Sequence, residues 1–368
     1  MGYDDLGCRA GHACRLIWIP PFYSIKSIRE FSNLEPSATP RTLLRVKITV
    51  LGPGAWGTAL AKLAHEGGHA ITLWGIPERL AKIAYSNQNT DYLPGIDLPT
   101  NWSLEADMQK AISEAEGIIL AIPSRSFREV AGKLEGFKKI AVSVTKGIEH
   151  ESGLTMGGIL EEIAPQASIA ALSGPSLAIE VAQGIPTGLV CASTDQEAAK
   201  TVQEWFHRPP LRTYTASDIH GVELGGALKN VMAIAAGVCD GLKMGDNAKA
   251  ALITRGLNEM KRLGTAAGAE TATFYGLSGM GDLTVTCFSK QSRNRTLGER
   301  IAKGEALKDV LADATAEGYP TTKSAKTLAE KLKINTPIID EVHAMLYEGK
   351  DVRQAVIDLT TRDPRAET

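Results

Sequence analysis

The sequence is poor in the features that mark several protein classes. Its five cysteines are scattered and form no CxxC pair, which is typical of a protein from a reducing cytoplasm rather than of a zinc or redox motif. No run reaches the roughly 18 apolar residues that a membrane span needs. The early apolar stretch from Leu16 to Ile19 stops at Pro20 and is too short for a secretory signal. We therefore expect a soluble, cytoplasmic protein without membrane insertion.

Charge of one sign is lacking as well. The 40 basic and 42 acidic side chains nearly cancel, so nothing global favours nucleic acid or an anionic membrane. Hydrophobic residues make up 43% of the chain and charged residues 22%, which is ordinary for a globular protein. We expect no nucleic-acid partner, and any anion site must be local.

The length of 368 residues favours two domains. Residues 1–45 show no clear period and carry scattered Pro, Ser and Arg. We interpret them as an N-terminal extension with poor order: an organellar address, a flexible tail, or the result of a start codon placed too far upstream. We expect a dinucleotide-binding domain over residues 46–210 and a helical substrate domain over residues 211–363.

A glycine-rich turn follows the first strand-like run. The β-branched run Lys47–Leu51 leads into GPGAWG (52–57) and then into a helical stretch. In this context Gly52 makes the tight turn, Gly54 admits a pyrophosphate close to the backbone, and Gly57 lets the helix pack near the strand. The glycines of an ordinary loop would show the same letters, but the strand–turn–helix setting favours a dinucleotide site.

Further apolar runs predict the rest of a sheet. Because helical stretches separate most of them, they indicate an α/β fold with a doubly wound, mostly parallel, Rossmann-like sheet. Such sheets bind ligands at the carboxyl ends of their strands, where this chain places Ser124, Lys146, Gly174 and Ser176. The runs span residues 70–74, 117–122, 140–145, 169–172 and 188–192.

The coenzyme preference depends on the end of the second strand. A strict NAD enzyme usually has an acid about 20 residues after the glycines, to hold the ribose 2′-hydroxyl. Here the strand ends in Trp74, Gly75 and Ile76, the nearest acid is Glu78, and Arg79 beside it would favour a 2′-phosphate. We expect NADP or NAD as the coenzyme, with the pattern favouring NADP or the use of both.

One segment matches the sequence pattern of a zinc-binding motif but not its structural requirement. HEGGH at residues 65–69 matches H-E-x-x-H, but zinc coordination needs both histidines on one face of a continuous helix. Gly67 and Gly68 end helices, so the two rings would not stay in register. We expect no metal site.

From Gly221 onward the strand signals fade, which predicts an all-helical C-terminal domain. Residues 225–237 are apolar on nearly every face except at Lys229 and Asn230, so this helix should be buried. A buried ammonium is costly unless it is paired or neutralised. The head of Lys229 either reaches solvent or a carboxylate, or it is a general acid/base whose pKa is lowered by burial and by Lys146.

Two later segments add candidate substrate contacts. Asp282 would hydrogen-bond an ammonium or a substrate hydroxyl, and Arg293 offers a planar fork that suits phosphate. Ser292 and Asn294 would add neutral donors, although the same residues also fit a solvated helix start. Two further candidates for a phosphate contact, which spacing does not rank, are Arg255 and Lys323.

An ordered series of motifs gives the chain a family resemblance. From Val46 to about Arg362 it resembles the NAD(P)-dependent glycerol-3-phosphate dehydrogenases of the bacterial type. The motifs are GPGAWGTALA (52–61), VTKGIE (144–149), SGPSLAIEVA (173–182), GVELGGALKNVMAIAAG (221–237), GLSGMGDLTVTC (276–287), QSRNR (291–295) and EGYPTTK (317–323).

The resemblance implies roles for individual residues. Lys229 would be the proton acceptor in the oxidative direction. The family commonly has a polar or basic residue just after the second strand, whereas this chain has Ile76 and is one residue shorter there, so the resemblance does not decide the coenzyme preference. The implied substrate contacts are Lys146, Gly174, Ser176, Lys229, Asp282, Ser292, Arg293 and Asn294. The implied coenzyme contacts, beside the glycines, are Ala55, Trp56, Lys146, Ala178, Arg293, Thr315 and Glu317.

The resemblance also implies an activity. We expect hydride transfer between NAD(P) and the pair sn-glycerol 3-phosphate and dihydroxyacetone phosphate, which would supply glycerol 3-phosphate for phospholipid synthesis. The partner is a phosphorylated triose, and a homodimer is left open. The alternatives are another two-domain dehydrogenase of the 6-phosphogluconate or 2-hydroxyacid type, or a dinucleotide-sensing protein without catalysis.

Overall fold

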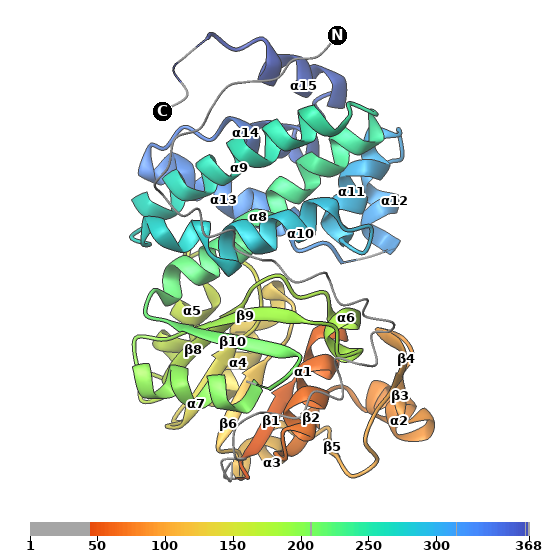
Figure 1. Ribbon diagram of the computed structural model, residues 1–368, viewed down its shortest axis with the longest axis vertical. Coiled ribbons are helices and arrows are strands. Elements are labelled where there is room, and N and C mark those ends of the chain that lie inside the picture. Colours follow the sequence, from red (N-terminus) through yellow and green to blue (C-terminus); the bar gives the residue numbers. More distant parts are fainter. Residues whose placement is uncertain (1–44, 207, 314, 365, 367–368) are drawn as a thin grey trace, which may run out of the picture.

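The chain folds into a sheet-containing part and a helical part, stacked along the long axis of the molecule (Figure 1). The computed structural model describes residues 45–368 except 207, 314, 365, 367 and 368. All but the last residue of the expected N-terminal extension therefore lies outside the described residues. Helix α8 (Ile219–Gly241) begins beside the sheet and runs up into the helical part.

The sheet has eight strands in the order β10-β9-β8-β7-β6-β1-β2-β5. Neighbours are parallel except β8 and β9, which are antiparallel. From β1 the chain moves outward to β2 and β5 and then returns to β6 on the other side of β1, so a topological switch point lies between β1 and β6. The strands are β1 (Lys47–Leu51), β2 (Ala70–Trp74), β5 (Ser103–Glu105), β6 (Gly117–Leu120), β7 (Ile140–Ser143), β8 (Ser168–Ser173), β9 (Thr187–Ala192) and β10 (Leu211–Ala216); β3 (Gln88–Asn89) and β4 (Leu93–Asp97) form a separate hairpin.

Helices cover both faces of the sheet, which explains the nearly continuous apolar strands. In β6 every residue is buried, with Ile119 in one apolar cluster and Ile118 and Leu120 in another. Successive side chains of a strand point to opposite faces, so both faces need apolar residues. The helices of this part are α1 (Ala55–Glu66), α2 (Pro77–Ser86), α3 (Met108–Ser113), α4 (Phe127–Ala131), α5 (Met156–Ile163), α6 (Ala178–Ala182) and α7 (Gln196–Phe206).

The sheet extends beyond the boundary expected at residue 210. Residues 211–216, assigned above to the helical part, form the edge strand β10 in parallel register with β9. Its side chains alternate between buried and exposed at first and carry three polar residues, so the strand lacks the continuous apolar run of the inner strands. An edge strand with one wet face gives a weak signal in the sequence.

The helical part is built around α8, as its apolar composition predicts. By length and composition α8 is the one helix in the described part of the chain that would suit a membrane span, but its apolar window is wholly buried in the protein, as in a core helix. The α/β sheet followed by an all-helical region is confirmed. The remaining helices are α9 (Asp246–Ala266), α10 (Asp282–Phe288), α11 (Arg293–Ala302), α12 (Leu307–Asp313), α13 (Gly318–Leu332), α14 (Pro337–Tyr347) and α15 (Val352–Thr360), with short helical turns at Thr271–Tyr275 and Leu277–Gly281.

Candidate active site

The glycine turn after β1 has the geometry of a dinucleotide cradle. Gly52 has φ of 111°, and a Cβ there would lie 2.5 Å from the carbonyl oxygen of Ala121. A Cβ on Gly57 would overlap the carbonyl oxygen of Gly52, whereas a Cβ on Gly54 would meet nothing within 4 Å. The indole Nε1 of Trp56 is buried without a hydrogen-bond partner among the described residues. The turn thus offers open space, the first N–H groups of α1 and an unused donor, which fits a pyrophosphate.

The HEGGH letters lie across a helix end. Helix α1 stops at Glu66, Gly67 caps it, and Gly68 has φ of 92°. His69 lies beyond this turn, and its Nδ1 accepts a hydrogen bond from the backbone N–H of Val46 at 3.3 Å. The two histidines therefore do not share a helix, and the described residues contain no group of three His, Cys, Asp or Glu side chains placed to hold a metal.

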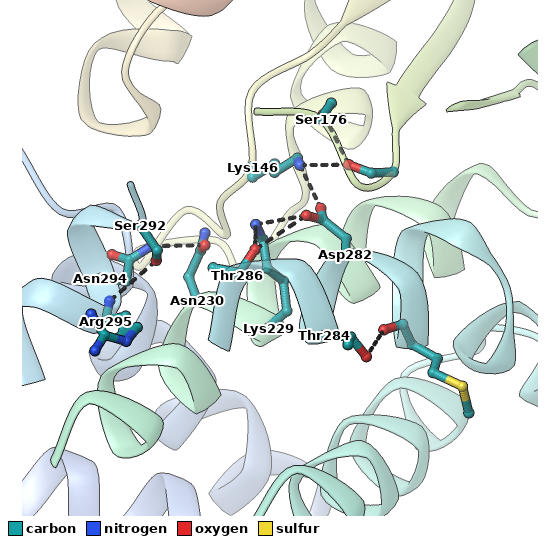
Figure 2. A network of polar contacts seen from close by, with 12 residues as sticks. Lys146, Ser176, Lys229, Asn230, Asp282, Thr284, Thr286, Ser292, Asn294 and Arg295 are labelled. Carbon is teal, nitrogen blue, oxygen red and sulfur yellow. Dashed lines mark hydrogen bonds and ion pairs between the residues drawn. The ribbon is translucent and has the colours of Figure 1, made fainter. Parts of the chain in front are cut away.

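A buried polar centre surrounds Lys229 (Figure 2). Lys229 lies on α8, is 6% exposed, and donates from Nζ to Asp282 Oδ1 at 2.9 Å and to Thr286 Oγ1 at 2.6 Å. The other carboxylate oxygen of Asp282 accepts a hydrogen bond from Lys146, which follows β7. One carboxylate, only 1% exposed, thus holds two ammonium groups that come from the two parts of the molecule.

Burial and charge set the protonation of this centre. Burial, together with the nearby Lys146 ammonium, lowers the pKa of Lys229 to about 8 despite the opposing pull of Asp282. For Asp282, burial alone would raise the pKa, but the ammonium groups of Lys146 and Lys229 hold it below its usual value. The centre therefore combines a fixed carboxylate with a lysine that exchanges its proton near neutral pH.

The residues expected at the edge of the sheet meet beside this centre. Gly174 follows β8, and its carbonyl oxygen accepts from Lys146 Nζ at 3.4 Å and from Ser176 Oγ at 2.9 Å (Figure 2). Helix α8 approaches here through Gly226, where a Cβ would lie 2.9 Å from Ser173 Oγ and 3.4 Å from the Lys146 side chain. A larger residue on α8 would push the helix away from Lys146.

The start of α11 is tied to α8 by an amide bridge. Asn294 donates from Nδ2 to Asn230 Oδ1 at 2.8 Å and accepts from the backbone N–H of Gly318 at 2.8 Å. Ser292 caps α11 by accepting from the N–H of Arg295 at 3.2 Å. Ser292 and Asn294, the two expected neutral donors, thus make hydrogen bonds within the protein. The bond from Asn294 holds the start of α11 beside Asn230, the residue that follows Lys229 on α8.

Arg293 lies apart from the Lys229 contacts. It is the first residue of α11, it is exposed, and it forms no ion pair with any described residue. It lines a cavity of about 190 Å³, together with Lys290 and Arg300 and with apolar side chains that include Leu297 and Val310. Its guanidinium is therefore available for an anion. The two other phosphate candidates, Arg255 on α9 and Lys323 on α13, are also exposed.

The expected coenzyme contacts lie at the starts of helices, and one of them, Glu317, also accepts hydrogen bonds from Ser124. Ala55 and Trp56 begin α1, and Ala178 begins α6. Glu317 immediately precedes α13, and its carboxylate accepts hydrogen bonds from the backbone N–H of Ser124, at 3.2 Å, and from the Ser124 hydroxyl. Ser124 lies just beyond β6, so Glu317 reaches the side of the glycine turn. Thr315 is exposed two residues earlier.

Sequence reasoning missed one residue of this site and one contact. Thr286 bonds Lys229 and lies four residues after Asp282 on α10, a spacing that puts both side chains on one helix face and would have pointed to it. Ser124 is expected at the ligand-binding edge of the sheet, but its contact with Glu317 spans 193 residues of sequence, and no short-range pattern marks that contact.

Comparisons with known proteins agree on one family. Residues 47–199 match the family described as NAD-dependent glycerol-3-phosphate dehydrogenase N-terminus, and residues 218–357 match its C-terminus. The chain is 45% identical over 331 residues to a glycerol-3-phosphate dehydrogenase [NAD(P)+] of Chlorobium phaeobacteroides (88% of this chain, 99% of the relative) and 46% identical over 330 residues to that of Geobacter metallireducens (87% and 98%). The crystal structure of glycerol-3-phosphate dehydrogenase from Coxiella burnetii is similar, with a TM-score of 0.84 and 36% identity, over 86% of this chain and 99% of that one.

Proposed function

The chain belongs to the NAD-dependent glycerol-3-phosphate dehydrogenase family, so it is an oxidoreductase that interconverts sn-glycerol 3-phosphate and dihydroxyacetone phosphate with NAD(P), and we propose that Lys229 is its general acid and base. The observation that carries this assignment is the buried Nζ of Lys229, held by Asp282 and Thr286 at the edge of the sheet where ligands bind. This lysine also changes its protonation close to working pH.

The glycine turn and its neighbours would hold the coenzyme. Gly52, Gly54 and Gly57 would cradle the pyrophosphate at the start of α1, where the fit described above leaves open space. When bound, the nicotinamide gives or takes the hydride that is exchanged at C2 of the triose. The remaining contacts that we propose are Ala55, Trp56, Lys146, Ala178, Arg293, Thr315 and Glu317.

Lys229 would move the proton that accompanies the reaction. In the reducing direction its ammonium faces the negative charge that develops on the C2 oxygen and donates the proton from Nζ. In the oxidising direction the free amine takes the hydroxyl proton. Because the pKa of Lys229 is about 8, the ammonium form that reduction needs dominates below this pH, and the amine form that oxidation needs dominates above it.

The neighbours of Lys229 would orient the reaction. Asp282 holds both ammonium groups in place, and Lys146 would stabilise the same substrate oxygen or the one beside it. Arg293 would bind the phosphate, since it is exposed, forms no ion pair within the described residues and begins α11 close to the Asn294 bridge. That remote binding energy would position C2. The remaining substrate contacts that we propose are Gly174, Ser176, Ser292 and Asn294.

We also propose a cellular role. The described cysteines Cys191, Cys239 and Cys287 are free and buried, which fits a reducing cytoplasm. Glycerol 3-phosphate made there would enter phospholipid synthesis. A homodimer is the assembly to test first, by light scattering of the purified protein.

A substrate comparison tests the proposed function. Oxidation of NADPH and of NADH is followed separately with dihydroxyacetone phosphate and with simple 2-oxo acids, and reduction of NADP and NAD is followed with 6-phosphogluconate. We expect turnover with the phosphorylated triose alone. Turnover of one of the other substrates in its place would favour a different two-domain dehydrogenase. Quenching of coenzyme fluorescence without turnover of any substrate would favour a dinucleotide sensor.

A further inference from the structure

The segment after β2 has no carboxylate where the ribose of NAD would need one. The strand ends at Trp74, and Ile76, which is half exposed, takes the N-cap position of α2 with no side-chain cap. A Cβ on Gly75 would lie 2.5 Å from the ring of Pro53, so this segment packs directly on the glycine turn. In a dinucleotide-binding sheet this is the place of the adenosine ribose. The chain therefore presents an apolar residue there in place of an acid.

A guanidinium stands one turn further along α2. Arg79 lies over the ring of Tyr92, with its Cζ 4.8 Å from the ring centroid. Arg79 forms no ion pair with any described residue, and Asp91, which precedes Tyr92 in the chain, pairs with Lys82 at 2.8 Å. A guanidinium stacked on an aromatic face keeps its edge N–H groups free for a planar, bidentate acceptor such as phosphate.

The aromatic platform is fixed relative to the glycine turn. Asn89, only 3% exposed, donates from Nδ2 to the Pro53 carbonyl oxygen and to Thr58 Oγ1, both at 2.8 Å. The backbone N–H of Tyr92 donates to the carbonyl oxygen of Asn89 at 3.2 Å. These bonds tie the β3–β4 hairpin, which lies beside α2 in Figure 1, to the turn that would hold the pyrophosphate.

We propose that Arg79, stacked on Tyr92, binds the 2′-phosphate of NADP(H) and makes NADPH the preferred coenzyme. This inference rests on the proposed dinucleotide role of the glycine turn and adds the residue that distinguishes the two coenzymes. The 2′-phosphate brings a negative charge and acceptor oxygens to an arginine without a carboxylate partner. The ribose diol of NADH offers no such charge, and Ile76 provides no acceptor for its hydroxyls. Glu78 is the one acid in the segment from Trp74 to Arg79, and it is exposed beside Arg79.

Two adenosine fragments test this without any turnover. Adenosine 2′,5′-bisphosphate and 5′-AMP differ only by the 2′-phosphate, and their affinities are measured by calorimetry on the full chain. We expect the bisphosphate to bind at least ~10-fold more tightly, as one charge-assisted hydrogen-bond pair at a partly exposed site implies. Arg79→Ala should remove this difference and leave 5′-AMP affinity unchanged. Lys110→Ala removes an exposed cation from α3, which is in no ion pair with the described residues, and should leave the difference intact.

Three results would overturn the proposal. The first is equal binding of the two fragments by the unaltered protein, and the second is an equal weakening of both by Arg79→Ala. The third is a selective loss of 5′-AMP or NADH affinity in Glu78→Gln, which would assign the ribose diol to that carboxylate. Tyr92→Leu should lower the preference less than Arg79→Ala, since the cation remains without its platform. The ratio of kcat/KM for NADPH over NADH should follow the fragment affinities. Selective binding of the bisphosphate without triose turnover would leave this proposal standing and would reject the proposed function.

Discussion

The glycine turn, which would bind the coenzyme, is built from backbone, whereas the Lys229 centre, which would move the proton, is built from charged side chains. The turn uses six contiguous residues, and its properties come from backbone that approaches backbone where Gly52 and Gly57 lack a Cβ. The centre uses side chains from the loop after β7, from α8 and from α10, and its properties come from charges paired in a largely buried position. The turn is therefore sensitive to added volume, and the centre is sensitive to lost charge.

The largest effect should follow from removing the titrating amine. Lys229→Ala should lower kcat by at least ~10²-fold, the low end for general acid/base groups, because it removes the buried amine that would give and take the substrate proton. Coenzyme affinity should be retained, since the glycine turn is untouched. Steady-state rates with dihydroxyacetone phosphate and a coenzyme titration by fluorescence measure the two quantities.

The control for this variant is an exposed lysine of the same helical part. Lys331→Ala on α13 should change neither quantity by more than about twofold, as expected for a surface substitution. Normal turnover of Lys229→Ala would make the general acid/base assignment wrong, and loss of coenzyme binding together with turnover would point to misfolding instead.

A smaller effect should follow from adding one carbon to the turn. In Gly57→Ala the Cβ would overlap the carbonyl oxygen of Gly52 and lie 2.9 Å from the Cβ of Ala121, so α1 must move. Overpacking of this kind costs about 1–3 kcal/mol, which we expect as a lower melting temperature and as coenzyme affinity reduced by ~10-fold or more.

Gly54→Ala is the matched variant. Its Cβ would meet nothing within 4 Å in the protein, so the melting temperature without coenzyme should stay unchanged. Coenzyme affinity should still fall, because the added carbon fills the space that the pyrophosphate needs. Unchanged coenzyme affinity in Gly54→Ala would show that the pyrophosphate does not lie close to the backbone at Gly54.

The same contrast explains what the sequence could predict. The turn was predictable because strand, glycines and helix are contiguous, and Lys229 was predictable because an ammonium is conspicuous in an apolar helix. The amide bridge from Asn230 through Asn294 to Gly318 was not, since its partners are 64 and 24 residues apart and meet only after α11 and α13 pack on α8. Strand β10 falls in the part that the sequence predicts to be helical, because its polar residues replace the continuous apolar run of the inner strands.

A second buried charge on α8 sharpens the comparison within one helix. Glu223 lies six residues before Lys229 and accepts from the backbone N–H of Gly157 at 2.7 Å, but no cation pairs with it in the described part of the chain. Burial raises the pKa of Glu223 to about 7, against hydrogen bonds from Thr155 and Gly157 that favour the carboxylate. Lys229 thus has a counter-charge for its ionised form, and Glu223 has none.

Glu223→Gln should consequently change stability and leave turnover within about twofold. Because the folded-state pKa of Glu223 lies above its unfolded value of about 4.5, ionisation favours the unfolded chain, and stability falls as pH rises from about 4.5 to about 7. The loss amounts to about 1 kcal/mol for each pH unit over that interval. Urea midpoints at about pH 5 and about pH 8 should differ less in Glu223→Gln than in the unaltered protein, whereas the exposed Glu151→Gln should keep the original difference. An identical pH dependence in Glu223→Gln would mean that this carboxylate already ionises at its ordinary pKa, and the contrast between the two buried charges of α8 would then disappear.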